Sequence, residues 1–240
     1  MQQVKPLFKR EFAGYFRSPV AYVFSVVFLA SAAILTFFPG QFFESNEASL
    51  RTLFQFFPWI FLLMAPAICM RLWAEEKRSG TWELLFTLPL TTVEAVLGKF
   101  LAAWAFFTIA ILLTFPMVVT VAYLGTPDWG PIFTGYLGAI LMGGSYLAIC
   151  SLASALTRNQ VIAFVLSFLI CLVLLFLGIG LVNDLMGTLL PWWLAEGISQ
   201  FSFLSRYEAL MIGLLPVGDI LFFILLGLFA LATTVLVLER

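Results

Sequence analysis

The sequence contains no histidine and very few charged residues. Among 240 residues, Lys and Arg number 12 and Asp and Glu number 13, so charged residues make up only 10%. Without histidine, the chain has no Ser-His-Asp hydrolase site, no HExxH metalloprotease site and no His-ligated haem or zinc site. A formal net charge of −1 provides no basic footprint for nucleic acid. A nucleic-acid partner is therefore not expected.

Cysteine and phosphate-binding motifs are also scarce. The three cysteines, Cys69, Cys150 and Cys171, lie far apart in apolar runs and form no CxxC pair. This pattern predicts small, buried core residues rather than a redox or metal site. No GxxxxGK[ST] loop occurs in the chain, so it does not bind and hydrolyse ATP on its own.

Apolar residues are abundant instead. The composition is 62% hydrophobic and the mean hydropathy is +1.07, whereas soluble domains are about 45–50% apolar. A soluble domain of this size has no way to cover so much apolar surface. The composition therefore indicates an integral membrane protein.

Long apolar runs predict where the chain crosses the bilayer, whose core of about 30 Å needs ~20 apolar residues per helix. None of the runs contains Asp, Glu, Lys or Arg, so the residues typical of ion-driven carriers are absent from them. If the protein moves a solute, the energy must come from a partner. We expect an all-α integral membrane fold with six transmembrane helices, at residues 19–38, 53–70, 100–124, 133–153, 161–182 and 220–238.

The basic residues between the predicted spans indicate the orientation. Residues 39–52, 125–132 and 183–219 contain only Arg51 and Arg206, and the other ten basic residues lie in the alternate connections and the terminal segments. Because Lys and Arg concentrate on the cytoplasmic side, both termini are expected in the cytoplasm.

The N-terminal segment 1–18 is amphipathic. Apolar residues recur at helical spacing, and basic residues mark the other side: Val4, Leu7, Phe8, Phe12, Tyr15 and Phe16 against Lys5, Lys9, Arg10 and Arg17. This pattern predicts an interfacial helix attracted to anionic membrane lipid. It serves either as a plain anchor or as a lever that touches a cytoplasmic partner.

The connection 71–99 is the most highly charged one. Gly80 is expected to end a helix that runs in from the second span, and Thr91 with Glu94 forms a capping box for the helix leading into the third span. Between them, residues 81–90 combine Glu83 with an apolar ridge. This element suits docking into a groove of another protein; the alternative is a solvated turn held against the protein's own helix ends.

Two further segments are open to more than one interpretation. The external connection 183–219 is expected to form one or two short, re-entrant helices, which either line an exit or act as a lid, and Asp219 is expected to cap the last span. The fourth span carries small residues that allow close helix packing within one subunit or between two: Gly135, Gly138, Ala139, Gly143 and Gly144.

Residues 71–85 carry a resemblance to a known family. They form an acidic-basic cluster followed by Gly-Thr-x-Glu-x-Leu, and a proline comes next at Pro89. This passage resembles the ABC-2 type permeases, the six-helix membrane subunits of one class of ATP-driven exporters, as does the start of the chain from Lys9 to Pro19. Within this family the combination is similar to the gliding-motility-associated (GldF-type) permeases, and residues 48–51, which lead into 57–59, add to that likeness.

The resemblance implies an ABC-2 (type V exporter-like) fold, with an interfacial helix at 1–18 and a transmembrane domain at 19–240. It implies a non-catalytic subunit whose partner ATPase dimer binds ATP and Mg. The ATPase contact would comprise two groups of residues: Lys5, Lys9, Arg10, Phe12 and Phe16 in the N-terminal helix, and Glu75, Glu76, Lys77, Arg78, Gly80, Thr81, Glu83, Leu84 and Leu85 in the coupling element.

Further partners also follow from the resemblance. They are a second permease, identical or related, and a membrane-anchored protein with an extracytoplasmic domain, in a bacterial cytoplasmic (inner) membrane. The expected function is a permease subunit that couples ATP hydrolysis by the partner to substrate export. The alternative is a scaffold or mechanotransmission subunit of a membrane ATPase complex that carries no solute.

Overall fold

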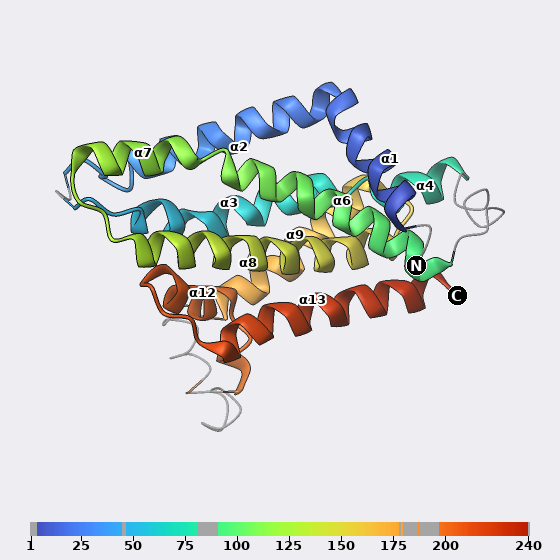
Figure 1. The fold of residues 1–240 in the computed structure, drawn as a ribbon. Helices are drawn as coiled ribbons and strands as arrows, with labels where there is room; N and C mark the ends of the chain where they lie inside the picture. The colour runs from blue at the N-terminus through green and yellow to red at the C-terminus, as the bar shows by residue number, and fades with distance from the viewer. Residues whose placement is uncertain are drawn as a thin grey trace.

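The computed structural model describes residues 4–44, 47–80, 91–177, 179, 187 and 197–239. The elements in these ranges are helices that run mostly side by side (Figure 1). In chain order they are α1 (Val4–Arg17), α2 (Pro19–Phe37), α3 (Arg51–Cys69), α4 (Ala74–Ser79), α6 (Thr92–Leu112), α7 (Phe115–Leu124), α8 (Trp129–Ala155), α9 (Gln160–Phe176), α12 (Phe203–Met211) and α13 (Val217–Leu238).

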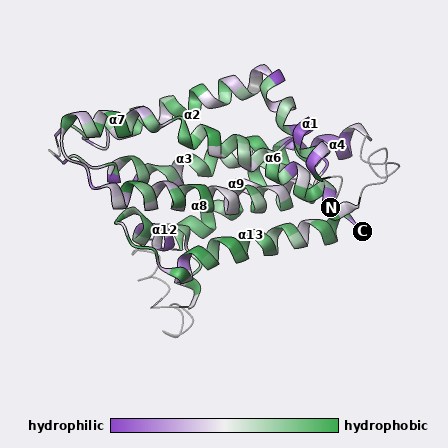
Figure 2. Ribbon diagram, viewed as in Figure 1, coloured by the Kyte–Doolittle hydropathy of each residue, from purple (hydrophilic) through white to green (hydrophobic). Residues whose placement is uncertain are grey.

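The long helices are apolar along most of their length, and hydrophilic residues gather around α1 and α4 (Figure 2). Among the described residues, four helical stretches are long and apolar enough to cross a membrane, or five if the bent pair α1–α2 is one span. The four are Arg51–Ser79, Thr92–Leu124, Trp129–Ala155 and Val217–Leu238. The chain is therefore a multi-pass membrane protein.

These stretches contain four of the predicted spans, at 53–70, 100–124, 133–153 and 220–238. The span predicted at 19–38 coincides with α2, which is bent by 73° from α1 at Ser18–Pro19. The span predicted at 161–182 begins on α9, which has 17 residues, and residues 178 and 180–182 lie outside the described ranges. Exactly six crossings therefore stay a prediction.

The predicted span 100–124 is divided into α6 and α7. Pro116 has no backbone N–H to donate to the carbonyl of Leu112, where α6 ends. The hydroxyl of Thr114 compensates within the break, because it donates to the carbonyl of Ile111 at 2.7 Å and lies 2.8 Å from the hydroxyl of Tyr136 on α8. Proline thus produces a helix break in which the Thr114 hydroxyl satisfies the carbonyl of Ile111 and contacts the neighbouring helix.

Helix α8 is the centre of the bundle and contacts α3, α6, α9, α12 and α13. Its small residues face large side chains of this same chain. A Cβ added at Gly135 would lie 2.4 Å from the ring of Phe54 on α3, and one added at Gly143 would lie 2.8 Å from the ring of Phe107 on α6. These glycines therefore serve helix packing within one subunit.

We expect Gly135→Ala to destabilise the bundle by about 2 kcal/mol, because the added methyl group overlaps a rigid, buried ring. The apparent melting temperature in detergent should fall by several degrees. Gly227→Ala on α13 is the matched control, since a Cβ there meets nothing within 4 Å. Equal melting temperatures for the two variants would contradict the tight contact of α8 with α3.

The three cysteines converge where α3, α8 and α9 meet. All three are free and buried, as predicted. The sulfur atoms of Cys150 and Cys171 lie 3.8 Å apart, and the thiol of Cys69 donates to the carbonyl of Leu147 on α8 at 3.4 Å. Their separation in sequence gave no sign of this proximity.

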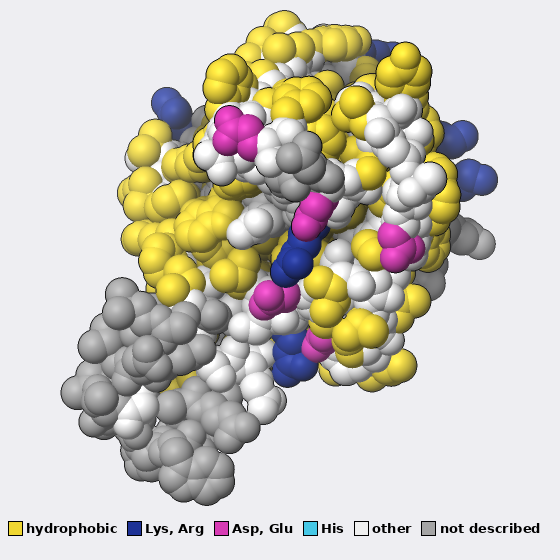
Figure 3. All heavy atoms as spheres, turned by 90° about the vertical axis from the view of Figure 1, so that its left-hand side faces the viewer, with side chains coloured by type: hydrophobic (Ala, Val, Ile, Leu, Met, Phe, Trp, Pro, Cys, Tyr) yellow, Lys and Arg dark blue, Asp and Glu magenta, His cyan; other side chains and the backbone are white. Residues whose placement is uncertain are grey.

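The two termini and α4 lie at one end of the bundle, which we call the terminus end, and α7 and α12 lie at the other (Figure 1). This arrangement agrees with the prediction that both termini share one side of the membrane. At the opposite end, Figure 3 shows basic and acidic side chains side by side in the middle of the face, with hydrophobic side chains around them.

Helix α12 closes part of this opposite end. Tyr207 donates to the carbonyl of Gly135 at 3.1 Å, and Arg206 forms an ion pair of 2.7 Å with Asp219. Contrary to the prediction, Asp219 does not cap the last span, because α13 begins earlier, at Val217, and places Asp219 inside its first turn. Its carboxylate holds α12 to α13 through Arg206.

Candidate functional site

Helix α4 is a short element whose N-terminal capping group is supplied by a neighbouring helix. No side chain of its own caps it, but the hydroxyl of Ser154 on α8 accepts hydrogen bonds from the backbone N–H groups of Trp73 and Ala74, both at 3.2 Å. These are donors that the helix itself leaves unsatisfied. The start of α4 is therefore fixed to the end of α8.

The end of α4 follows the prediction. Gly80 has a φ of 71°, the left-handed conformation that glycine adopts without a Cβ penalty, and it terminates the helix. Acidic residues occupy the first turn and basic residues the last turn, which suits the helix dipole. The capping box of Thr91 and Glu94 at the start of α6 is also confirmed, with both reciprocal hydrogen bonds present.

Trp73 anchors α4 in the bundle. The side chain is fully buried, and its indole N–H donates to the hydroxyl of Ser151 on α8 at 2.9 Å. A buried tryptophan needs such an acceptor for its N–H group. Because Ser151 and Ser154 lie one turn apart on α8, they hold the backbone and the ring of Trp73 together.

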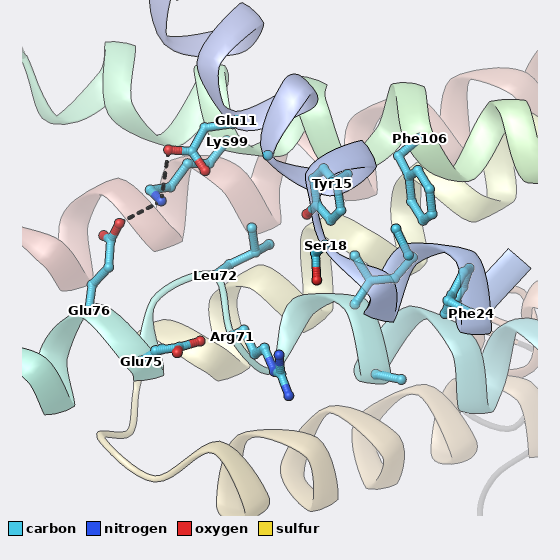
Figure 4. Close-up of a pocket in the computed structure, with 14 residues that line it drawn as sticks. Glu11, Tyr15, Ser18, Phe24, Arg71, Leu72, Glu75, Glu76, Lys99 and Phe106 are labelled. Atoms are coloured by element: carbon cyan, nitrogen blue, oxygen red, sulfur yellow. Dashed lines mark ion pairs between the residues drawn. The ribbon is translucent and has the colours of Figure 1, made fainter.

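A buried lysine joins three elements at this point. The ammonium group of Lys99 on α6 lies 2.6 Å from a carboxylate oxygen of Glu76 on α4 and 3.5 Å from one of Glu11 on α1 (Figure 4). It also lies 5.5 Å from the centre of the Trp73 ring. We call Glu11, Trp73, Glu76 and Lys99 the Lys99 cluster.

The burial of the Lys99 charge makes its two ion pairs a strong link between α1, α4 and α6. Lys99 is only 4% exposed, and a buried charge is costly unless it is paired. Two carboxylates compensate it, and each comes from a different helix. Because separation of either carboxylate would leave the cation less well paired, α1, α4 and α6 are expected to move together at this end.

Helix α1 also packs on α6 through apolar contacts. Leu7 fills the space above Gly98, where an added Cβ would lie 2.7 Å from its side chain, and the ring of Tyr15 stacks on Phe106 at 4.9 Å. Phe12 stacks within α1 between its aromatic neighbours, and Phe16 is 40% exposed. The basic side chains on the other side of the helix are exposed: Lys5, Lys9 and Arg10.

The structure brings together only part of the predicted coupling element. Glu76 belongs to the Lys99 cluster, whereas Glu75, Arg78 and Gly80 are exposed. Lys77 donates to the carbonyl of Ala155, and its partial burial, together with the nearby Arg158, lowers its pKa. The remaining predicted residues lie outside the described residues: Thr81, Glu83, Leu84 and Leu85.

Sequence reasoning missed the partners of Glu76. Lys99 counted only as one more basic residue of the connection, and Glu11 only as part of the stretch from Lys9 to Pro19 that resembles the start of the ABC-2 permeases. The sequence offered only a weak indication of this cluster. Lys99 directly precedes a long apolar run, so its side chain has to lie near the ends of the membrane helices. Its partners come from segments far apart in the chain, so spacing could not identify them.

A cavity of about 340 Å³ lies next to the cluster, between α1, α3 and α6 (Figure 4). Glu11, Glu76 and Lys99 line one side of it, and Tyr15 and Arg71 also reach it. Within the part of the chain that the structure describes, no three His, Cys, Asp or Glu side chains gather in a group that could hold a metal ion. The cluster is thus suited to ion pairing and helix coupling.

Comparison with known proteins identifies the family of this chain. A search of curated proteins finds no match. The family model described as ABC-2 family transporter protein matches residues 32–238, which include α3, α4 and every later helix. Members of this family are generally non-catalytic membrane subunits that work with a partner ATPase. The chain belongs to the ABC-2 family of transporter proteins, as a membrane permease.

Proposed function

We propose that this permease couples ATP hydrolysis by a separate ATPase to export of a substrate, with the ATPase docked at the terminus end. The single observation that carries the proposal is the Lys99 cluster, in which one buried cation links α1, α4 and α6. A displacement imposed on α4 from outside the membrane would be passed to α6, a membrane helix, and to α1. Such a link is what a coupling element requires.

The distribution of basic residues supports docking of the ATPase at the terminus end. Ten of the 12 basic residues lie in the terminal segments and the connections on the same predicted side, which favours the cytoplasm for this end of the molecule. The exposed side chain of Arg78 on α4 is available there for contacts with a partner. In this proposal ATP and Mg bind to the ATPase dimer, and the protein resides in a bacterial cytoplasmic (inner) membrane.

The proposed complex contains two permeases, identical or related, and two ATPase subunits. Closure of the ATPases on ATP would move the coupling elements and open a path between two transmembrane bundles. The likeness to gliding-motility-associated permeases adds a membrane-anchored protein with an extracytoplasmic domain as a further proposed partner; that addition rests on analogy.

We predict that Glu83→Ala lowers the ATPase activity that the assembled complex supports by about tenfold, equivalent to about 1.4 kcal/mol of lost coupling. The reason is that Glu83 is the carboxylate of the predicted docking segment. ATPase rates of the complex in liposomes would measure the effect. Glu208→Ala is the control, since Glu208 is an exposed carboxylate on α12, at the other end.

An unchanged rate for Glu83→Ala would contradict the coupling role of the segment. The same liposomes also test whether a solute is moved, because a transported substrate should stimulate ATP hydrolysis. A complex that hydrolyses ATP normally but responds to no candidate substrate would instead favour a scaffold or mechanotransmission subunit.

A further inference from the structure

The cavity beside the Lys99 cluster lies where the apolar helices end. Ser18 directly precedes α2, and Arg71 directly follows the span predicted at 53–70; both line the cavity. Charged residues thus meet apolar helix ends at this depth, as lipid headgroups meet acyl chains in a bilayer. A volume of about 340 Å³ falls within the range of small-molecule sites.

The cavity has an apolar wall and a polar wall. Phe24 on α2, Ile68 on α3 and Phe106 on α6 form part of the first, and the second carries Arg71 and Glu75 (Figure 4). Such a division suits an amphipathic ligand, with hydrocarbon against the rings and a charged group against the polar side chains.

The charges on the polar wall are not all compensated. Lys99 is paired with two carboxylates. By contrast, the exposed side chains of Arg71 and Glu75 form no hydrogen bond or ion pair within the described ranges. A ligand that complements this wall needs an anionic group for Arg71 and an N–H-bearing cation for the carboxylate of Glu75.

We propose that this cavity binds the headgroup of phosphatidylethanolamine from the adjacent leaflet. The phosphate lies against the guanidinium of Arg71, and the primary ammonium donates to the carboxylate of Glu75. The start of an acyl chain lies along Phe24 and Phe106. The inference holds whichever substrate the permease carries.

The ammonium group explains the choice among lipids. A primary ammonium has three N–H donors, whereas the trimethylammonium of phosphatidylcholine has none, so only the former donates a hydrogen bond to the carboxylate of Glu75. Phosphatidylglycerol offers no cation to this carboxylate. Soluble phosphoethanolamine has the same charges, but it leaves the apolar wall uncovered, so the lipid is the better occupant.

Native mass spectrometry of the delipidated full chain in detergent tests the proposal without any substitution. The probes are phosphatidylethanolamine, its N-monomethyl and N,N-dimethyl derivatives, and phosphatidylcholine, all with the same acyl chains. The affinity should fall stepwise as N–H donors are lost, by about tenfold across the series. Equal affinities, or tighter binding of phosphatidylglycerol, would overturn the proposal. If soluble glycerophosphoethanolamine displaced phosphatidylethanolamine at equal concentration, the claim that the occupant is a lipid would be wrong.

Two variants test the side chains. Arg71→Ala and Glu75→Gln should each weaken phosphatidylethanolamine binding by about tenfold, with the helix content and melting temperature of the wild type. Arg158→Ala is the matched control, because Arg158 is exposed in the connection between α8 and α9 and does not line the cavity. Wild-type binding by both variants, or equal losses in all three, would show that the cavity is not the binding site.

Discussion

Replacement of Lys99 by Met should have the largest functional effect of any single substitution at the terminus end. Removal of the buried cation leaves Glu76 without a cationic partner among the described residues and leaves Glu11 paired only with Arg10, at 2.8 Å. Loss of one partner of a buried ion pair costs about 3–5 kcal/mol. We therefore expect a free energy of unfolding lower by about 3 kcal/mol, and a loss of ATPase stimulation in the assembled complex of about tenfold or more.

Thermal unfolding in detergent and ATPase rates in liposomes would measure these two effects. Arg51→Met is the matched control, since Arg51 is an exposed basic residue at the start of α3, outside the predicted ATPase contact. Adding Glu76→Gln to Lys99→Met should restore part of the stability, because it removes the carboxylate that lost its cation. If Lys99→Met kept wild-type stability and activity, this result would contradict the coupling of α1, α4 and α6 through the Lys99 cluster.

Trp73→Ala is expected to destabilise the protein by about 3–5 kcal/mol, the usual cost of truncating a large aromatic side chain in a core. Trp73 is fully buried, and its loss would also leave the hydroxyl of Ser151 without its donor. The start of α4 would lose its attachment to α8. Melting temperature and protease resistance of α4 would report the change.

Trp59→Ala provides the comparison for this substitution. Trp59 lies on α3 but is 38% exposed, so its truncation removes less buried contact and should cost clearly less. Trp73→Phe, which keeps the apolar volume and loses the N–H group, should fall between the two. A cost for Trp59→Ala as large as that for Trp73→Ala would contradict the anchoring role.

Local signals in the sequence predicted local structure well. Four of the six apolar runs coincide with helical stretches long enough to cross a membrane, Gly80 marked the end of α4, and Thr91 with Glu94 marked the start of α6. Each of these features depends on residues within a few positions of one another. Helix capping and hydropathy are therefore readable without the fold.

Features that depend on distant segments were not predictable. Glu11, Glu76 and Lys99 lie on separate helices, and only the fold brings them together. The glycines of α8 indicated close helix packing, but the sequence could not say whether the partner was the same subunit. Pro116 divides the span predicted at 100–124 into α6 and α7, and the contact of Thr114 at this break with Tyr136 on α8 joins segments far apart in the sequence.

The structure also bears on the role of α1. A plain membrane anchor needs an apolar face and basic residues, and nothing more. Helix α1 has in addition a carboxylate, Glu11, directed at Lys99, and a ring, Tyr15, stacked on Phe106. These contacts favour the lever interpretation, in which α1 follows the motion of α4 and α6.

Purification of the tagged full chain from its native membrane in mild detergent, with identification of the proteins recovered, tests the central claim most directly. We expect a soluble protein with a GxxxxGK[ST] loop to be recovered with the permease in stoichiometric amount. That protein should be lost when Glu83→Ala is purified and retained with Glu208→Ala. Recovery of the permease without any such ATPase, under conditions that preserve other membrane complexes, would contradict the proposed coupling.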